Sequence, residues 1–275
     1  MNLFSQAYGL AQSAHFPTAL SVGGLVALLI WYPTLTYVSI LSGVTTAFIT
    51  LVAFLLNDIN DVKSDSLSKP HRPLVRGLIS KNASLCCVSV LVSMIILLLA
   101  TLLIATIYGL LLILYFVLCI CYTLIKARFA VCKDFYVGFT LAIPLLYGVI
   151  EGGSLNFQNM FLISAFIFYI AHRELLMDIH DMKGDSALGV RTIPVLFGTF
   201  SAYIYSWLLW ILATCCILVL YQSLQGFRVM ILLFIFVSGF QLLFSCMIVV
   251  NWRIFMLTQW IPLLILGMLL SYCCN

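Results

Sequence analysis

The sequence contains few charged residues. Only 8% of its 275 residues are Asp, Glu, Lys or Arg, whereas 64% are hydrophobic and the mean hydropathy is +1.18. Soluble domains carry roughly a quarter charged residues, so this composition excludes an ordinary soluble protein. We therefore expect an integral membrane protein in contact with a lipid bilayer, and we expect no nucleic-acid partner.

Two further absences narrow the interpretation. The first 14 residues contain no Lys or Arg. The basic region of a cleaved signal peptide is therefore missing, and the first apolar segment is expected to be a retained helix. The 10 cysteines show no metal-type spacing beyond adjacent pairs. Most lie in apolar runs, where a free Cys behaves as a small apolar residue, so neither a disulfide framework nor a redox role is expected.

Apolar runs that are long enough to cross a bilayer, about 17–25 residues, follow one another along the whole chain. The third and fourth runs are nearly fused around residues 105–108. Nine membrane spans are predicted, at residues 15–32, 36–57, 84–104, 106–124, 134–150, 158–176, 198–221, 229–249 and 254–273.

The positions of the basic residues support nine spans. Twelve of the 13 Lys and Arg residues fall in loops or span ends on one side of the predicted membrane, and only Arg228 falls on the other. Cytoplasmic loops carry the excess of Lys and Arg, so the N-terminus and the even-numbered loops are predicted to be cytoplasmic. The C-terminus is then external. We assign Lys81, Lys133 and Arg253 to this topological signal.

The few acidic residues are concentrated in two similar clusters. "NDINDVKSD" (57–65) ends the second span and "MDIHDMKGD" (177–185) ends the sixth, and together they hold six of the nine acidic residues. Within each cluster the aspartates are spaced three and then four residues apart, which places them on one face of a helix. The aspartates are Asp58, Asp61 and Asp65 in the first cluster and Asp178, Asp181 and Asp185 in the second.

Carboxylates at these spacings repel one another unless something positive lies between them. One such cluster can be explained by solvated acids that merely end a helix. Two copies of the cluster are poorly explained in this way. Magnesium takes oxygen ligands, usually one or two carboxylates together with phosphate and water. Two facing carboxylate stripes are therefore predicted to hold two or three Mg²⁺ ions around a diphosphate.

Basic residues near the clusters suit the same ligand, because Arg forks and Lys ammonium groups bind phosphate oxygens. We assign Arg72, Lys126 and Arg191 to the diphosphate. Further candidates are Lys69, Arg76, Arg128, Arg173 and Lys183.

The similarity of the two halves extends beyond the acids. "DINDVKSDS" and "DIHDMKGDS" share six residues in register, and one residue of slip aligns "PLVRG" with "PVLFG". We interpret residues 1–275 as a single domain with pseudo-repeat motifs at 57–77 and 177–198. A duplication of this kind brings equivalent loops together around one site.

These motifs resemble the UbiA superfamily of intramembrane prenyltransferases. "NDINDVKSD" is similar to its NDxxDxxxD motif, "DIHDMKGD" to its second aspartate motif, and "YTLIK" (122–126) to the YxxxK element between them. The resemblance covers residues 57 to about 198 in the same order. It implies an all-α integral membrane fold of nine transmembrane helices around a central cavity, with a cytosolic cap and a lateral opening to the bilayer.

The resemblance also implies roles for individual residues. Asp58, Asp61, Asp65, Asp178, Asp181 and Asp185 would bind Mg²⁺. Asn57 would belong to the first magnesium and diphosphate set, and Arg72, Lys126 and Tyr122 would contact the diphosphate. Lys183 and Arg191 are assigned to the diphosphate from their charge alone. The catalytic set would be Asp61, Asp181, Lys126 and Tyr122, and metal ions and cations would stabilise the diphosphate as it departs from an isoprenyl diphosphate.

The fate of the resulting allylic cation is open on sequence alone. The first interpretation is transfer to a lipophilic acceptor of the aromatic or quinone type. The region before the first span carries His15 and lacks the Arg by which many relatives bind a hydroxybenzoate-like acid, so a carboxylated acceptor is less favoured. The second is a terpene cyclase that needs no second substrate. A transporter whose acids line a cation path ranks third, because pathway acids usually lie in mid-membrane.

Other side chains are ambiguous. Aromatic faces attract cations by roughly 0.5–2 kcal/mol, and Tyr115, Phe116, Tyr147, Phe168 and Tyr169 are candidates for stabilising an allylic cation. For each of them individually, helix packing or lipid contact is the favoured interpretation. His172 and Glu174 lie about one turn before the second cluster and are predicted to support it or to assist deprotonation of an acceptor.

Overall fold

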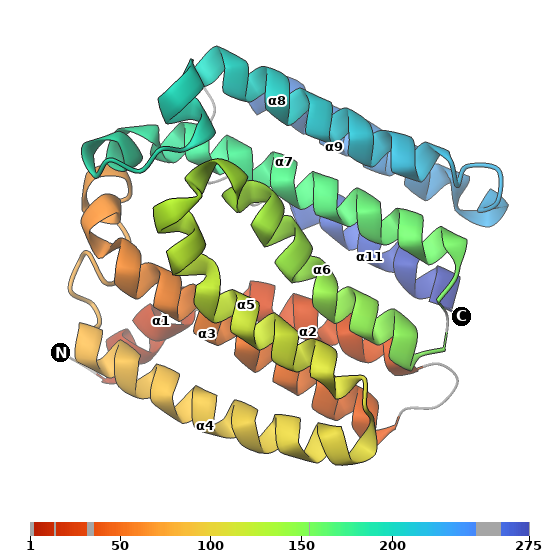
Figure 1. Cartoon of the computed structure of the whole chain (residues 1–275), viewed down its shortest axis with the longest axis horizontal. Helices are drawn as coiled ribbons and strands as arrows, with labels where there is room; N and C mark the ends of the chain where they lie inside the picture. The colour runs from red at the N-terminus through yellow and green to blue at the C-terminus, as the bar shows by residue number, and fades with distance from the viewer. Residues whose placement is uncertain (1–2, 14, 32–35, 154, 246–259, 275) are drawn as a thin grey trace.

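The computed structural model is all-helical over the residues it describes, which are 3–13, 15–31, 36–153, 155–245 and 260–274 (Figure 1). Short 3₁₀ turns lie at Ala130–Cys132 and Gln225–Phe227. The α-helices are α1 (Leu3–Ser13), α2 (Phe16–Trp31), α3 (Tyr37–Ser68), α4 (Lys81–Ala105), α5 (Gly109–Arg128), α6 (Lys133–Glu151), α7 (Phe157–Ala187), α8 (Ile193–Leu218), α9 (Arg228–Ser245) and α11 (Trp260–Cys274).

The predicted spans and the observed helices agree in order. Each of the nine predicted spans overlaps one described helix, from α2 to α11. Within the described ranges, seven stretches are long and apolar enough to cross a membrane, whereas α2 and α11 contribute shorter apolar helices, Phe16–Ile30 and Ile261–Cys273. The chain is therefore a multi-pass membrane protein. Nine complete crossings, the central cavity and the cap remain predictions. The boundary between the last two spans, and Arg253 with it, lies outside the described residues.

Helices α3 and α7 are much longer than a membrane crossing requires. They contain 32 and 31 residues, which corresponds to about 48 and 46 Å at 1.5 Å per residue. In α3 the apolar part from Tyr37 to Leu56 covers about 30 Å, the thickness of the hydrocarbon core. The aspartate cluster therefore begins where the helix leaves the apolar layer, and α3 continues as a helix until the segment that contains Pro70 and Pro73.

The start of α8 contains a sharp break. Gly198 has a φ of +82°, inside what is otherwise a continuous helix from Ile193 to Leu218. Only glycine adopts this backbone conformation without a steric penalty. The break separates one turn at the membrane surface from the long apolar part of α8. It coincides with residue 198, where the seventh span was predicted to begin.

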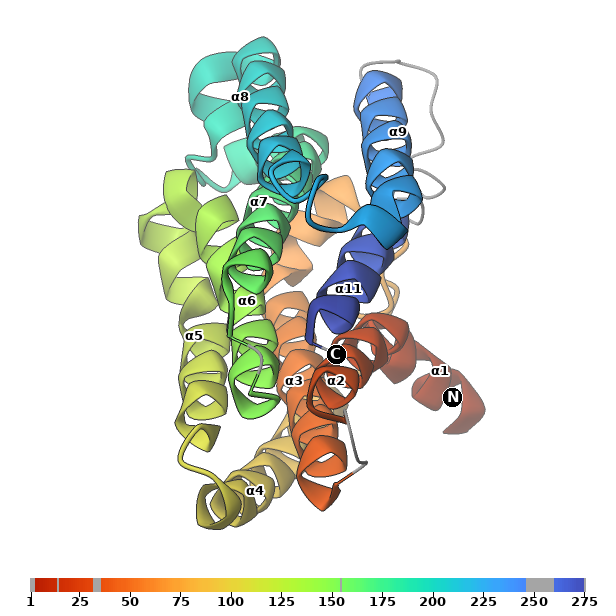
Figure 2. The ribbon, with the colours of Figure 1, turned by 90° about the vertical axis from the view of Figure 1, so that its right-hand side faces the viewer.

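Among the described residues, three hydrophobic clusters hold the helices together. One joins α2, α3, α4 and α5 with Tyr147 of α6, and another joins α6, α7, α8, α9 and α11 with Leu29 of α2. A smaller third cluster joins α7 and α8. Turned by 90°, the structure shows α4 at one end, α8 and α9 at the other, and α3, α5, α6 and α7 between them (Figure 2). Helices α3 and α7 also contact each other directly. The interior therefore positions the ends of these two helices side by side.

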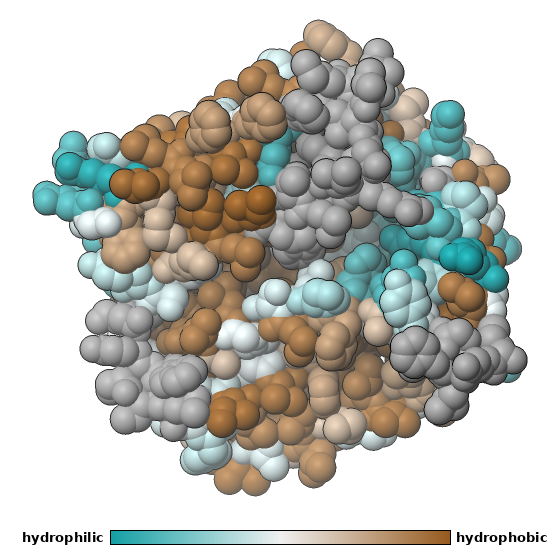
Figure 3. Space-filling view, turned by 180° about the vertical axis from the view of Figure 1, so that it is seen from behind, coloured by the Kyte–Doolittle hydropathy of each residue, from teal (hydrophilic) through white to brown (hydrophobic). Residues whose placement is uncertain are grey.

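The outside of the molecule is apolar over much of its surface. Viewed from behind, hydrophobic residues cover much of the face and hydrophilic residues gather towards its two ends (Figure 3). Large apolar side chains such as Leu97, Phe200 and Phe236 are more than 60% exposed. Such exposure is unfavourable in water and favourable in lipid, so this surface fits a bilayer environment.

The crossing of α2 and α3 depends on two glycines. A Cβ atom at Gly23 would lie 2.3 Å from the carbonyl oxygen of Gly43, and a Cβ at Gly43 would lie 2.7 Å from that of Gly23. Small residues allow helix backbones to approach closely in membranes. Gly24, by contrast, has no atom within 4 Å of such a Cβ.

We predict that Gly23→Ala destabilises the protein by about 1–3 kcal/mol, because overpacking forces the two backbones apart. Gly24→Ala, one residue away on the same helix, should leave stability unchanged or slightly higher. Thermal unfolding of both variants in the same detergent tests this. Equal melting temperatures for the two variants would show that the crossing tolerates a methyl group.

Candidate active site

The two aspartate clusters lie at the same end of the molecule. Three crossings separate α3 from α7, so the two helices run in the same direction and their C-terminal ends meet at the left of Figure 1. Both aspartate motifs are helical over their whole length, as the 3–4 spacing predicted. The structure therefore brings together the residues that the sequence places 120 positions apart.

Each first-cluster aspartate has a basic partner from another part of the chain. Arg72, in the segment after α3, forms ion pairs with Asp58 and, at 3.3 Å, with Asp65. Lys126, near the end of α5, donates to both carboxylate oxygens of Asp61 at 2.8 Å. These contacts are consistent with the prediction that Arg72 and Lys126 both belong to this site.

The second cluster is neutralised in the same way. Lys69 lies 2.5 Å from Asp181 and so connects the segment after α3 to α7. Lys133, the first residue of α6, forms ion pairs with Asp178 and, at 3.2 Å, with Asp134. Asp185 interacts electrostatically with Lys126 and Lys133.

The assignment of Lys133 to membrane topology was wrong. Its side chain is 4% exposed and lies between two carboxylates, whereas a topological lysine would face water. Asp134, 2% exposed, is a site residue that sequence reasoning missed. It is one of only three acidic residues outside the two clusters. The adjacent opposite charges at 133–134 were the signal that could have identified the pair.

The internal repeat is preserved in the burial of the aspartates. The first and third members of both clusters are buried, and the middle members, Asp61 and Asp181, are partly exposed. Lys63 and Lys183 occupy equivalent positions, and both are exposed. Lys183 therefore resembles its outward-facing counterpart, and its predicted contact with a diphosphate has no support from this arrangement.

The remaining predicted residues lie around the same end of the bundle. Asn57 and Tyr122 are half-buried, and Tyr122 lies one turn before Lys126 on α5. Arg191 is exposed, in the short connection between α7 and α8. The structure does not test their roles, which stay predictions.

His172 is directed away from the clusters. Its Nδ1 lies 2.7 Å from the hydroxyl of Ser206 on α8, and the ring is buried between the two helices. Glu174 instead pairs with Arg173 at 2.8 Å and interacts electrostatically with Lys133 and Asp134. Of these two predicted supporting residues, only Glu174 belongs to the charged site.

Three candidate aromatics serve helix packing. Tyr115, Tyr147 and Tyr169 are completely buried. Their hydroxyl groups lie within hydrogen-bonding distance of Thr50, Ser42 and Gln241, respectively, on neighbouring helices. These contacts favour the packing interpretation over the stabilisation of a cation.

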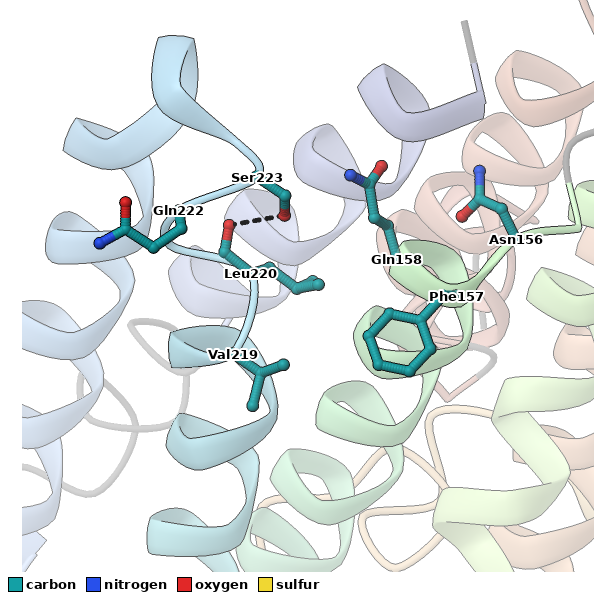
Figure 4. A pocket seen from close by; sticks show the side chains of 7 residues that line it. All are labelled: Asn156, Phe157, Gln158, Val219, Leu220, Gln222 and Ser223. Atoms are coloured by element: carbon teal, nitrogen blue, oxygen red, sulfur yellow. Dashed lines mark hydrogen bonds between the residues drawn. The ribbon is translucent and has the colours of Figure 1, made fainter.

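A pocket of about 460 Å³ lies at the other end of the molecule (Figure 4). It is lined by the start of α7, including Phe157, and by the turn after α8, where the Ser223 hydroxyl donates to the carbonyl of Leu220 at 3.0 Å. Along α7, Phe157 and Asp178 are about 31 Å apart. This pocket is therefore not part of the charged site.

Comparison with known proteins identifies the family. The model of the UbiA prenyltransferase family matches residues 16–260. The chain belongs to this family. The resemblance that the three motifs suggested is thus confirmed over most of the sequence.

Curated UbiA relatives share part of this sequence. The chain is 29% identical over 165 residues to a digeranylgeranylglyceryl phosphate synthase from Thermococcus sibiricus, which covers 58% of each protein. It is 33% identical over 148 residues to the synthase of the same name from Pyrococcus furiosus, covering 54% of this chain and 52% of that one. The chain thus spans little more than half the length of the curated relatives it matches.

Solved UbiA homologues show the same fold over almost the whole chain. A UbiA homologue from Aeropyrum pernix has a TM-score of 0.72 at 19% identity and covers 95% of this chain and 97% of its own. One from Archaeoglobus fulgidus, determined with GPP and Mg²⁺, has a TM-score of 0.73 at 15% identity and covers 96% and 98%. These likenesses establish the arrangement of the helices.

The carboxylates fit the Mg²⁺ that was predicted for this site. Among the described residues, no three His, Cys, Asp or Glu side chains are already arranged around a common metal position, and lysine and arginine groups lie against the aspartates. Asp134, Asp178 and Asp181 each retain a buried carboxylate oxygen that lacks a hydrogen-bond partner. Buried polar atoms without partners are costly, and oxygen atoms of this kind are the ligands that Mg²⁺ prefers.

We predict that Lys133→Met destabilises the protein by about 3–5 kcal/mol, because it leaves the carboxylates of Asp134 and Asp178 buried without their cation. Lys81→Met, which removes an exposed lysine that was assigned the same topological role, should change stability by less than about 0.5 kcal/mol. Thermal unfolding in Mg²⁺-free detergent solution compares them. A Lys133→Met protein as stable as Lys81→Met would contradict the assignment of a buried ion pair.

Proposed function

We propose that this protein is a Mg²⁺-dependent prenyltransferase. It ionises an isoprenyl diphosphate at the membrane surface and transfers the prenyl group to a lipophilic acceptor. The observation that carries the proposal is the pair of facing aspartate clusters on α3 and α7. Four basic side chains neutralise them, namely Lys69, Arg72, Lys126 and Lys133.

The ion pairs divide into two classes that suit two roles. Lys133 and its partners are almost completely buried, so this lysine is a fixed counter-ion. Lys69, Arg72 and Lys126 keep 12–18% of their side-chain surface exposed. They are positioned to turn from carboxylates to the phosphate oxygens of a substrate. Arg72 is suited to paired contacts with phosphate and the lysines to single charges.

Bound Mg²⁺ supplies positive charge that stabilises the diphosphate as the carbon–oxygen bond breaks. The chain contributes cations that are held in place before the reaction, which is the arrangement that lowers the energy of developing charge. The aspartates hold this charge at the edge of the apolar layer. A prenyl chain attached to the diphosphate then extends along the apolar parts of α3 and α7, away from water.

The acceptor we propose is a lipid that carries a glyceryl phosphate group. The names of the curated relatives describe a product with two geranylgeranyl groups on glyceryl phosphate, and such a product arises when a hydroxyl of a prenylated glyceryl phosphate is alkylated. This proposal replaces the aromatic or quinone-type acceptor that the sequence motifs suggested. The lack of an Arg near the start of α2 agrees with an acceptor other than an aromatic acid.

We also propose that the charged end of the bundle faces the cytoplasm. Lys69, Arg72, Lys126 and Arg191 all belong to it, whereas Arg228 follows the turn at the opposite end. Such a bias is typical of the cytoplasmic side. A water-soluble diphosphate made in the cytoplasm would then reach the site directly.

A product assay tests the proposed function. Purified protein with Mg²⁺ receives geranylgeranyl diphosphate together with a singly prenylated glyceryl phosphate, a phenolic acceptor or no acceptor, and products are identified by mass spectrometry. We expect a doubly prenylated glyceryl phosphate. Asp61→Asn and Asp181→Asn should lower its rate at least about 100-fold, because each removes a carboxylate that would hold Mg²⁺ against the departing diphosphate.

Glu151→Gln is the matched control for loss of a carboxylate. Glu151 lies at the opposite end of α6, where it accepts a hydrogen bond from Thr106 at 2.7 Å, and its replacement should leave the rate unchanged. A cyclic hydrocarbon or terpene alcohol formed without acceptor would instead identify a terpene cyclase. Failure to consume or bind any prenyl diphosphate would refute the prenyl chemistry itself.

A further inference from the structure

His15 has an unusual backbone conformation at the junction of α1 and α2. Its φ is +47°, and it is the one non-glycine residue with a positive φ in the described part of the chain. The backbone is fixed on both sides, because its N–H donates to Gln12 and its carbonyl accepts from Thr18 and Ala19. Non-glycine residues in this conformation are uncommon and concentrate at functional sites.

The imidazole lies against α3, one helical turn from the first aspartate cluster. Its ring packs against Phe54 of α3, with 4.7 Å between ring centroids. Phe54 precedes Asp58 by four residues and therefore shares its helix face, one turn nearer the apolar layer. Ser13, at the end of α1, lies beside Asp58 itself. His15 is thus placed one helical turn below the carboxylates, at the depth where the first carbon atoms of a prenyl diphosphate would lie.

Three cations act on the imidazole of His15. They are Arg72, Arg173 and Lys69, and they come from the segment after α3 and from α7. The side chain keeps accessible surface. The three positive charges disfavour a further positive charge on the ring, which favours the neutral imidazole.

We propose that His15 accepts the proton from the acceptor's hydroxyl group during prenyl transfer. This inference rests on the proposed function and assigns one catalytic residue to it. Arg72 and Lys69 also belong to the proposed diphosphate site, and Phe54 lies near the end of the apolar part of α3. The imidazole is therefore at the edge of the apolar layer, where it meets the diphosphate site. A hydroxyl-bearing lipid that enters from the membrane would meet His15 beside the carbon atom that is alkylated.

The bonds and charges of this step balance without any further reactant. The bond from the first prenyl carbon to the diphosphate oxygen breaks, and the diphosphate keeps the electron pair. A lone pair of the acceptor oxygen forms an ether bond to that carbon. The hydroxyl proton passes to the unprotonated nitrogen of His15 and then to water. Because the departing diphosphate adds negative charge beside Lys69 and Arg72, it favours the imidazolium at the moment when that ion forms.

The alternative is that His15 only forms the turn between α1 and α2. Glycine and asparagine adopt a positive φ more readily than other residues, so His15→Gly and His15→Asn preserve this turn. Neither replacement supplies a base. Loss of the base should lower the transfer rate about 100-fold or more. Binding of an unreactive prenyl diphosphate analogue with Mg²⁺ should stay at the wild-type level.

Rescue by a small molecule separates the two roles. Imidazole added to His15→Gly should restore part of the lost rate, because the deleted ring leaves a space of its own shape beside Phe54. It should not help His15→Asn, whose side chain fills part of that space. Analogue binding and thermal unfolding show for each variant whether the fold is intact, and His15→Asn serves if the glycine variant does not fold.

The outcomes distinguish this inference from the function it rests on. Full activity of His15→Gly, or lost activity that imidazole does not restore, would overturn the role of His15 while wild-type transfer continued. A wild-type protein that transfers no prenyl group to any hydroxyl acceptor would overturn both.

Discussion

The structure depends on the neutralisation of carboxylates at the edge of an apolar layer. Six aspartates lie at the ends of two neighbouring helices, where like charges repel and where burial penalises each of them. Basic side chains from the segment after α3, from α5 and from α6 neutralise these carboxylates. They pair with Asp58, Asp61, Asp65, Asp178 and Asp181. Removing a helix from this arrangement would leave a buried charge unpaired. The charged site therefore holds the bundle in register as well as forming its chemistry.

The same charges explain why α3 and α7 continue as helices beyond the membrane. An isolated helix with three aspartates near its C-terminus is unfavourable, because the carboxylates face the negative end of the helix dipole. Here Lys69 and Arg72 lie immediately after α3 and return to the helix ends, Lys69 to α7 and Arg72 to α3. The long helices and the charged site are thus consequences of one set of ion pairs.

Much of this arrangement could be predicted from the sequence. The helix order follows from the apolar runs, and the two aspartate faces follow from the 3–4 spacing, because such a repeat has only one regular structure that aligns it. Arg72 and Lys126 were assigned to the same site as basic residues suited to a diphosphate. Lys133 and Asp134 were not placed, because only their adjacent opposite charges distinguish them from an ordinary charged loop. Their burial arises from the packing of α6 against α7. Helix α1 was also missed, because its short, uncharged sequence has no span-length apolar run.

The two residues of each ion pair are synthesised at different times. The ribosome synthesises the chain from its N-terminus, so Lys69 and Lys133 reach the membrane before Asp178 and Asp181, with which they pair. In the first half the order is reversed, and Asp58, Asp61 and Asp65 emerge before Arg72 and Lys126. Arg72 follows within a few residues, while Lys126 arrives two helices later. When the second half of the chain inserts, the lysines that neutralise its aspartates are therefore already present in the first half. The first half then guides the packing of the second.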